Sequence, residues 1–315
     1  MPARLHDTLG RFLGAPFDPN LRLYWGWLVG FALVAAVVWF RGERRRHPER
    51  TLLGWLSHRD LWGRRSTRLD AKVLAAGLLL QPAKHVSGWF GVAAVGTWVV
   101  LGLDSLFPAW EGATWSGWMA GLYALLLLLA NDFAMYWNHR LHHRVPALWA
   151  FHAVHHSADV LTPLTAYRKH PVYDATRTIL RAITAGPIQG LVAFAFAGQG
   201  QFLELLGINA LWALFLAANS NLRHSRVPLR YGRVLGRFLS SPSQHHLHHS
   251  SAPEHRDCNF ATVFSLWDVL FDTLRLPTGD EQLRYGLPDG PSHHTLFDAW
   301  IRPFADSFQS LRRTS

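Results

Sequence analysis

Apolar residues are gathered along this chain in blocks of about twenty, which short arginine-rich segments separate. Because a helix needs about 20 mostly apolar residues to cross the hydrocarbon core of a bilayer, residues 21–40, 88–107 and 117–137 each predict one membrane span. Residues 178–218 are apolar over about twice that length, and Gly-Gln-Gly-Gln at 198–201 interrupts them. This longer stretch predicts a tight hairpin of two spans. The pattern therefore predicts an all-α, polytopic integral membrane bundle with five spans.

Basic residues are concentrated on one side of these predicted spans. They fill residues 41–68 after the first span, follow the third span, and recur at 223–237 after the hairpin. The loop at 108–117 and the hairpin tip contain no Lys or Arg. Because basic loops stay on the cytosolic side, we expect the N-terminus outside and the C-terminus in the cytosol. Residues beyond 223 are not apolar enough to cross, and they should form a cytosolic helical cap.

Composition and charge narrow the class of protein further. Of 315 residues, 49% are hydrophobic and 17% are charged, which excludes a disordered chain. The single cysteine, Cys258, excludes a scaffold of intrachain disulfides. The net charge of +10 would suit a nucleic-acid partner, but the basic residues flank apolar spans and form no single basic stripe. We therefore expect no binding of nucleic acid.

Histidine carries the candidate chemistry of the chain. Thirteen of the 19 histidines lie between residues 139 and 255. Residues three or four apart share one face of a helix, so clusters with this spacing should converge at the membrane boundary. The clusters are His139 and His143; His152, His155 and His156; and His245, His248 and His249. His142 and His246 lie off these faces, and His224 stands alone between the second and third clusters.

The number of histidines predicts two metal ions. Imidazole is the commonest metal ligand in proteins, and eight or nine imidazoles exceed the set that one zinc ion uses. HExxH is absent, and no Glu precedes a His by three residues. Neither the zinc protease pattern nor the carboxylate di-iron pattern is therefore present. Redox-active iron would activate dioxygen toward a C–H bond, whereas zinc has no redox chemistry.

The residues around these histidines resemble a known family. The segments are NDFAMYWNHRLHHRVPALWAFHAVHHS from residue 131, YRKHP from 167, NLRHS from 221, SPSQHHLHHS from 241 and LWDVLFDT from 266. They are similar to the fatty acid hydroxylase/sterol desaturase superfamily of membrane-bound di-iron oxygenases. Relatives often carry a further His just before His224, where this chain has Asn219 and Ser220, and a Gly in place of Asp272. The resemblance implies two iron ions held by nine histidines: His139, His143, His152, His155, His156, His224, His245, His248 and His249.

Other polar residues are candidates for orienting these imidazoles. A metal-bound imidazole usually donates its outer N–H to a carboxylate or a carbonyl. Asp132 lies two helical turns before His139, and an acid inside an apolar span is costly and tends to be functional. Arg168 beside His170 suits either a lipid head group or a ligand imidazole. The candidates for orienting the ligands are Asp132, His170, Asn259 and Asp268, with Asp257 as a further one near the third cluster.

Four regions follow from these patterns. Residues 1–20 form an N-terminal interfacial segment, and 21–119 form a first transmembrane region. Residues 120–275 form the di-iron domain that the resemblance implies. Residues 276–315 form an irregular cytosolic tail with a short amphipathic segment near 297–308.

Together these features predict a membrane monooxygenase that hydroxylates or desaturates a C–H bond of a lipid with O₂. The lipid would be a fatty acyl, sterol-like or other membrane lipid. No nicotinamide or flavin fingerprint is present, so a separate ferredoxin or cytochrome should supply electrons. A membrane di-zinc hydrolase and a His-rich metal transporter or sensor stay open as alternatives. A transporter would place ionisable residues near the membrane midplane, whereas these clusters lie at the ends of the predicted spans.

Overall fold

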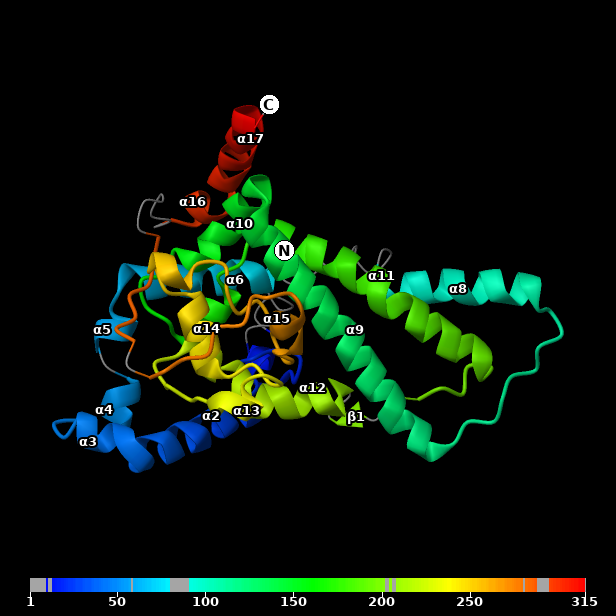
Figure 1. The fold of residues 1–315 in the computed structure, drawn as a ribbon, viewed down its shortest axis with the longest axis horizontal. Coiled ribbons are helices and arrows are strands. Elements are labelled where there is room, and N and C mark those ends of the chain that lie inside the picture. Colours follow the sequence, from blue (N-terminus) through cyan, green and yellow to red (C-terminus); the bar gives the residue numbers. More distant parts are fainter. Residues whose placement is uncertain are drawn as a thin grey trace.

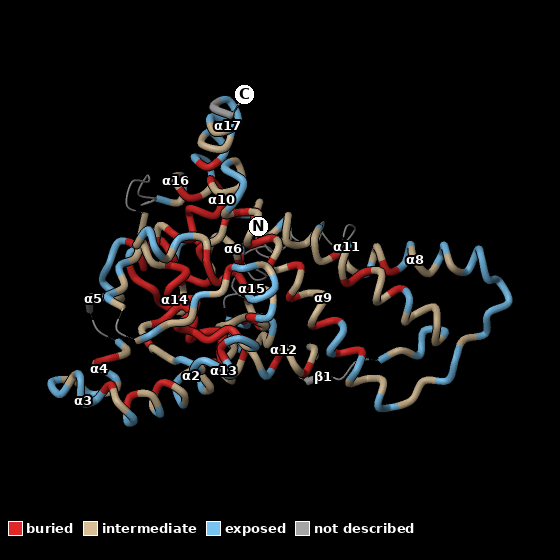
Figure 2. The backbone as a smooth tube through the Cα atoms, viewed as in Figure 1, coloured by how far each residue is buried: buried red, intermediate tan, exposed pale blue. Residues whose placement is uncertain are grey.

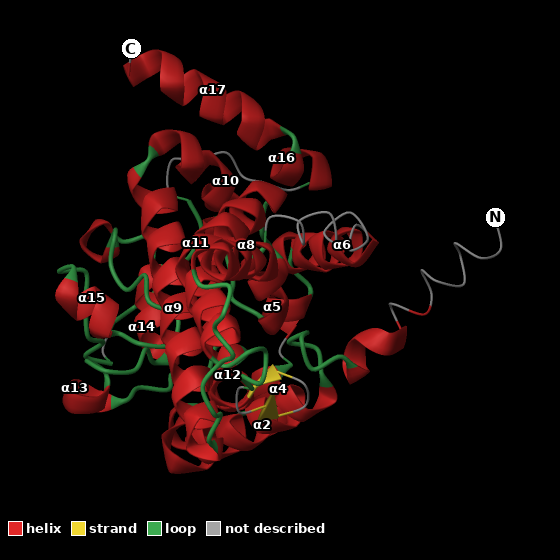
Figure 3. Ribbon diagram, turned by 90° about the vertical axis from the view of Figure 1, so that its right-hand side faces the viewer, coloured by secondary structure: helices red, strands yellow, loops and turns green. Residues whose placement is uncertain are grey.

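The computed structural model describes residues 10, 13–57, 59–79, 91–201, 204–205, 208–279, 281–287 and 295–314. Helices make up nearly all the regular structure of these residues (Figure 1, Figure 3). The exception is an antiparallel pair of two-residue strands, β1 (Glu204–Leu205) and β2 (Ile208–Asn209). The predicted all-α fold class is confirmed.

Three helices among the described residues are long and apolar enough to cross a membrane. The first, Trp25–Arg46, consists of α2 (Trp25–Val38), a π-helical segment η2 (Trp39–Glu43) and α3 (Arg44–Arg46). The second is α9 (Gly117–Arg144) and the third is α11 (Pro171–Ala195). The protein is therefore an integral membrane protein, as the apolar blocks predicted.

The prediction of five spans is not met by the described residues. The expected span at 88–107 contains α8 (Val92–Leu106), which is 15 residues long, and residues 80–90 lie outside the described chain. The second half of the expected hairpin holds β1, β2 and then α12 (Ala210–Phe215) with η5 (Leu216–Ser220). Those two helical pieces have six and five residues, or about 16 Å of helix against a core of about 30 Å. Asn209 caps the start of α12, so the helix begins too late to cross.

Glycines allow α8 and α11 to pack backbone against backbone. A Cβ on Gly190 would lie 2.5 Å from the carbonyl oxygen of Gly96, and a Cβ on Gly186 would lie 2.7 Å from Val95. Gly186 and Gly190 are four residues apart on α11, the small-xxx-small spacing that lets membrane helices approach closely. This glycine seam joins α8 to α11 along the outer end of the molecule (Figure 1).

Burial divides the molecule into two parts. Buried residues gather around α10 and α14, whereas α8 and the outer ends of α9 and α11 are mostly exposed or half-buried (Figure 2). Large apolar side chains on this outer part, such as Trp98 and Ile183, are exposed, as lipid-facing side chains are. The helices of the buried part and its surroundings are α4 (Leu52–Leu56), α5 (Arg59–Trp62), α6 (Arg65–Leu79), α10 (Pro146–His156), α13 (Gly232–Leu235), α14 (Pro242–His248) and α15 (Leu266–Leu270), with 3-10 turns η1 (Ala15–Phe17), η4 (Pro163–Tyr167), η6 (Leu222–His224) and η7 (Pro253–His255).

The C-terminal region is more regular than predicted. It ends in α16 (Leu296–Trp300) and α17 (Arg302–Thr314). Phe304 of α17 packs against Phe151 of α10, with ring centroids 5.2 Å apart, and Phe308 and Leu311 are exposed. The predicted amphipathic segment is thus part of a helix of 13 residues. One side of this helix packs against α10.

Candidate metal centre

Helix ends place the histidines opposite one another. α9 ends at Arg144, Val145 is extended, and Pro146 starts α10 at its first position, as the restriction on residues before proline favours. The sharp turn brings the last turns of α9 over α10. α14 starts at a capping box, in which Ser241 Oγ accepts from the Gln244 amide and Gln244 Oε1 accepts from the Ser241 amide. This cap sets the orientation of the helix that carries the third cluster.

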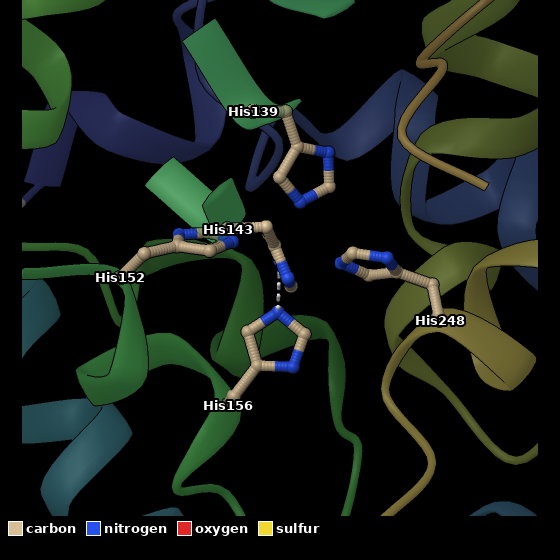
Figure 4. A group of neighbouring side chains, drawn as sticks. All are labelled: His139, His143, His152, His156 and His248. Atoms are coloured by element: carbon tan, nitrogen blue, oxygen red, sulfur yellow. Dashed lines mark hydrogen bonds between the residues drawn. The ribbon is translucent and has the colours of Figure 1, made fainter. Parts of the chain in front are cut away.

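The first histidine group consists of His139, His143, His152, His156 and His248 (Figure 4). One ligand atom from each ring lies within 4.8 Å of those of the others. His143 Nε2 and His156 Nε2 are 3.2 Å apart. The Nε2 atoms of His139, His152 and His248 are buried and have no hydrogen-bond partner. The sequence clusters from three helices thus meet in one point.

The second histidine group consists of His155, His224, His245 and His249. Its ligand atoms also lie within 4.8 Å of one another. His224 Nε2 lies 3.1 Å from His155 Nε2 and 3.0 Å from His245 Nε2. The isolated His224, which the helical spacing left without neighbours, therefore joins the second and third clusters.

The two groups are adjacent. The rings of His156 and His249, one from each group, are stacked with their centroids 4.5 Å apart, and His155 and His156 are consecutive. All nine predicted ligands are therefore brought together, in sets of five and four. His142 and His246 belong to neither set, since their rings bond to the carbonyls of Asn138 and Leu222.

Burial keeps these rings uncharged. It lowers the pKa of His152, His155, His156, His248 and their second-group neighbours well below the usual 6.5, and the proximity of other histidines adds to the effect. Neutral imidazoles offer lone pairs, which is the form that binds a metal ion. The site is thus a set of buried neutral donors.

Backbone carbonyls accept hydrogen bonds from the outer nitrogens of several rings. His139 Nδ1 lies 2.8 Å from the carbonyl oxygen of Phe260, and His248 Nδ1 lies 2.7 Å from that of Cys258. His155 Nδ1 lies 3.2 Å from the carbonyl oxygen of Arg168. A ring that donates from Nδ1 carries its lone pair on Nε2, which faces into the group. The chain therefore fixes the tautomer that a metal requires.

Charged side chains back two of the rings. Asp257 Oδ1 lies 3.5 Å from His143 Nδ1, and this contact lowers the pKa of the Asp257 carboxyl. On the other side of the site, Arg223 Nη2 lies 3.0 Å from His245 Nδ1. Arg223 also donates to Ser240 Oγ and to the carbonyls of Ala261 and Thr262. An anion thus stands behind the first group and a cation behind the second.

Residues 124–273, which contain all nine histidines, match the fatty acid hydroxylase family. The matched residues make up just under half of the chain. The resemblance stated from the motifs is confirmed, while the predicted domain boundaries stay a prediction.

The curated proteins that resemble this chain are distant relatives. The alkylglycerol monooxygenase of Danio rerio is 31% identical over 179 residues, which are 56% of this chain and 34% of the relative. The ornithine lipid hydroxylase OlsE of Rhizobium tropici is 28% identical over 51% of this chain and 44% of its own length. A Δ7-sterol 5(6)-desaturase of Gibberella zeae is 27% identical over 56% of this chain and 49% of its own length. The chain thus spans between a third and a half of these relatives. No solved structure matches it.

Three of the residues predicted to orient the imidazoles bond to the backbone near the rings and not to the rings themselves. Asp132 accepts hydrogen bonds from the amides of Val263 and Phe264 and from the Trp267 indole. Asp268 accepts from the amides of Phe260 and Ala261 and from Thr273 Oγ1, and burial raises its pKa to about 6. Asn259 donates to the carbonyls of Gln244 and Arg275. These side chains hold the segment whose carbonyls contact the rings, and they make no hydrogen bond to a histidine that the structure describes.

The side chains of His170 and Arg168 form hydrogen bonds and an ion pair within the fold. His170 Nδ1 accepts from the Val172 amide and so caps α11, and its Nε2 bonds to the carbonyl of Trp300. The Arg168 guanidinium is buried and pairs with Asp70 at 3.2 Å. Only the Arg168 carbonyl reaches the site. Sequence reasoning missed this carbonyl, those of Phe260 and Cys258, and Arg223, whose one signal is its place beside His224 in NLRHS.

Departures from the family pattern have visible consequences. Asn219 Nδ2 donates to the Ser240 carbonyl, while Asn219 Oδ1 and Ser220 Oγ are buried without a partner. Neither residue is among the nine rings, so the second group has four histidines where the first has five. Asp272 has φ of 55°, the left-handed region in which glycine is favoured, so the turn keeps its shape despite the substitution.

Proposed function

We propose that this protein is a membrane-bound di-iron oxygenase that hydroxylates or desaturates a C–H bond of a lipid. The observation that carries the proposal is the pair of adjacent, buried, all-histidine groups at one end of a cavity between apolar helices. The relatives' names support it, since each describes a monooxygenase, hydroxylase or desaturase of a lipid or sterol.

The donor set fits two iron ions. Five and four neutral imidazoles, with three Nε2 atoms buried and unpartnered in the first group, suit divalent metals that favour nitrogen ligands. We assign the first group to one ion and the second group to the other. Two irons held there would supply dioxygen activation and the removal of hydrogen from an unactivated C–H bond.

The chain's own residues present the substrate. A cavity of about 750 Å³ is lined by rings of both groups and by apolar side chains of α9. His139, His152, His155, His224 and His245 stand at its wall. Leu127, Leu128 and Met135 line the cavity further along α9. A lipid chain lying along this helix would bring a C–H bond to the rings.

Orientation and electron supply complete the proposal. The arginine-rich segments adjoin the histidine clusters in the sequence. We therefore propose that the site and the C-terminus face the cytosol. A separate ferredoxin or cytochrome would deliver the electrons. Reporter fusions after residues 112 and 315 test the orientation; an external C-terminus would contradict it.

Metal analysis and lipid analysis test the function together. Protein purified under reducing, anaerobic conditions should contain about two iron per chain. Lipid extracts of an expressing strain should contain a species heavier by one oxygen, or lighter by two hydrogens, than those of a strain expressing His139→Ala. Zinc alone with oxygen-independent lipid cleavage would favour the hydrolase and overturn the proposal. Metal uptake by vesicles without lipid oxidation would favour the transporter.

A further inference from the structure

The cavity continues well beyond the histidines. Along α9 its wall consists of residues that share one helix face, from His139 through Met135, Asp132, Asn131 and Leu128 to Leu127. These residues span about 18 Å at the rise of an α-helix. On α11 the wall runs from Tyr173, whose ring stacks on His152 at 4.8 Å, to Gln189. The cavity is therefore long enough for more than the reacting carbon.

Cations from two distant parts of the chain line this cavity. Arg22 precedes the first span, Lys169 precedes α11, and Arg177 and Arg181 lie one turn apart on α11; all four line the cavity. Two carboxylates share the wall. Asp132 is occupied by the amides of Val263 and Phe264 and by Trp267, and Asp174 pairs with Arg177 at 3.0 Å. The positive charge of the cavity is therefore in excess.

Three of these cations lack an ionic partner in the part of the chain that the structure describes. Arg22 Nη1 donates to the carbonyl of Ser220. Arg181 Nε donates to the amide oxygen of Asn131 at 2.6 Å. Lys169 Nζ lies 5.5 Å from the ring centre of Tyr173. None of the three forms an ion pair with a described residue.

A structural role explains these charges poorly. Arginines within a membrane span are costly and usually functional, and Arg177 and Arg181 repel each other at this spacing. The buried Arg168, by contrast, has an anion: it pairs with Asp70, and both side chains are at most 1% exposed. Burial and the nearby Arg177 lower the pKa of Lys169 to about 7. A bound anion would relieve this repulsion.

We propose that Arg22, Lys169, Arg177 and Arg181 bind the acidic group, a phosphate or carboxylate, of the lipid substrate. Guanidinium groups suit this role, because they bind phosphate and carboxylate oxygens through paired N–H donors. The inference rests on the proposed function, which supplies the reaction, and it names the class of lipid: one with an acidic head group. A neutral sterol or a neutral glycerol ether leaves Arg22, Lys169 and Arg181 without an anion among the described residues.

Binding of three probes to the metal-loaded full chain in nonionic detergent tests this proposal. The probes are dodecyl phosphate, dodecanol and inorganic phosphate, and their affinities are measured by titration calorimetry. Dodecyl phosphate should bind at least ~10-fold more tightly than either of the others. Equal affinity for dodecanol would show that charge is not recognised. Equal affinity for inorganic phosphate would show a free-anion site. Either result overturns the proposal.

Variants locate the binding. Arg177→Gln and Arg181→Gln should each weaken dodecyl phosphate by about 10-fold and leave dodecanol unchanged. Arg45→Gln, at an exposed residue at the end of the first span, should change neither affinity. Unchanged binding in both cavity variants would contradict the assignment. If the variants do not fold, the comparison of the three probes on the wild-type protein still tests the proposal. Because binding needs no turnover, a protein that selects dodecyl phosphate but oxidises no lipid would overturn the proposed function alone.

Discussion

The two histidine groups differ in the number of their rings and in the charges behind them. The first has five rings and is backed by Asp257 and by the carbonyls of Phe260 and Cys258. The second has four rings, and Arg223 lies against one of them. His224 Nδ1 in this group is buried without a partner.

This difference teaches that two similar-looking sites are electrostatically unequal. Acceptors behind an imidazole raise its basicity and strengthen its bond to a metal, whereas a guanidinium opposes positive charge. We therefore expect the first group to hold its ion more tightly and the second to release or exchange its ion more readily.

Removing one ring from each group should have the largest effect and should separate the groups. His224→Ala leaves three rings in the second group, so bound iron should fall from about two to about one per chain, with more than ~100-fold loss of lipid oxidation. His152→Ala leaves four rings in the first group and should retain more metal. Iron content by elemental analysis measures both.

A neighbouring histidine provides the control for those variants. His246→Ala removes a ring from α14 without touching either group, and folded protein should keep both ions. Loss of iron in that variant equal to the loss in His224→Ala would contradict the division into two groups.

Neutralising the anion behind the first group should have a smaller effect. Asp257→Asn removes the charge beside His143, and we expect about 10- to 100-fold weaker metal binding in that group alone. Competition with a chelator measures the affinity of the two sites separately. Glu254→Gln, at an exposed residue three positions away, should leave both affinities unchanged. Weakening of the second group instead would show that the backing charges are assigned to the wrong groups.

Acid should act on both groups, because burial lowers the pKa of rings in each. Between their lowered values and the usual 6.5, the unfolded chain binds more protons than the folded chain, so stability falls as pH falls. The melting temperature of metal-free protein should therefore decrease as the pH is lowered from 7 to about 5. It should change little between pH 7 and 8. Constant stability across the acidic range would mean that the rings are not held neutral.

The smallest predicted effect concerns the helix that both groups share. α14 supplies His248 to the first group and His245 to the second, and Ser241 caps its start. Ser241→Ala should cost about 1 kcal/mol of stability and weaken metal binding in both groups alike. Chemical denaturation and chelator competition measure these two quantities. A change confined to one group would show that α14 does not act as a unit.

Local spacing predicted the ring set well, because residues three and four apart on one helix stay together wherever the helix packs. Local spacing could not predict how the nine rings divide into groups of five and four. His155 and His156 are consecutive, yet they face different groups, and this depends on how α10 meets α14 in space. The contacts behind the rings were also missed, since backbone carbonyls such as that of Phe260 carry no residue-type signal.

Apolar blocks predicted the long helices for a similar reason. Length and hydropathy identify α9 and α11 directly, but they cannot tell a crossing helix from a short one that starts at a cap. Asn209 and the strands before it shorten the last block, and only the tertiary structure reveals this.

The order of the rings along the chain has a consequence for biogenesis. Four of the five rings of the first group come from α9 and α10, which are consecutive. The second group draws on α10, η6 and α14 and cannot exist until all three have met. Contacts between neighbouring helices form earlier than those that close long loops, and chains are synthesised from the N-terminus. We expect the hairpin of α9 and α10 to bind the first ion while the chain is still being synthesised. The second ion should bind last, once α10, η6 and α14 are in contact.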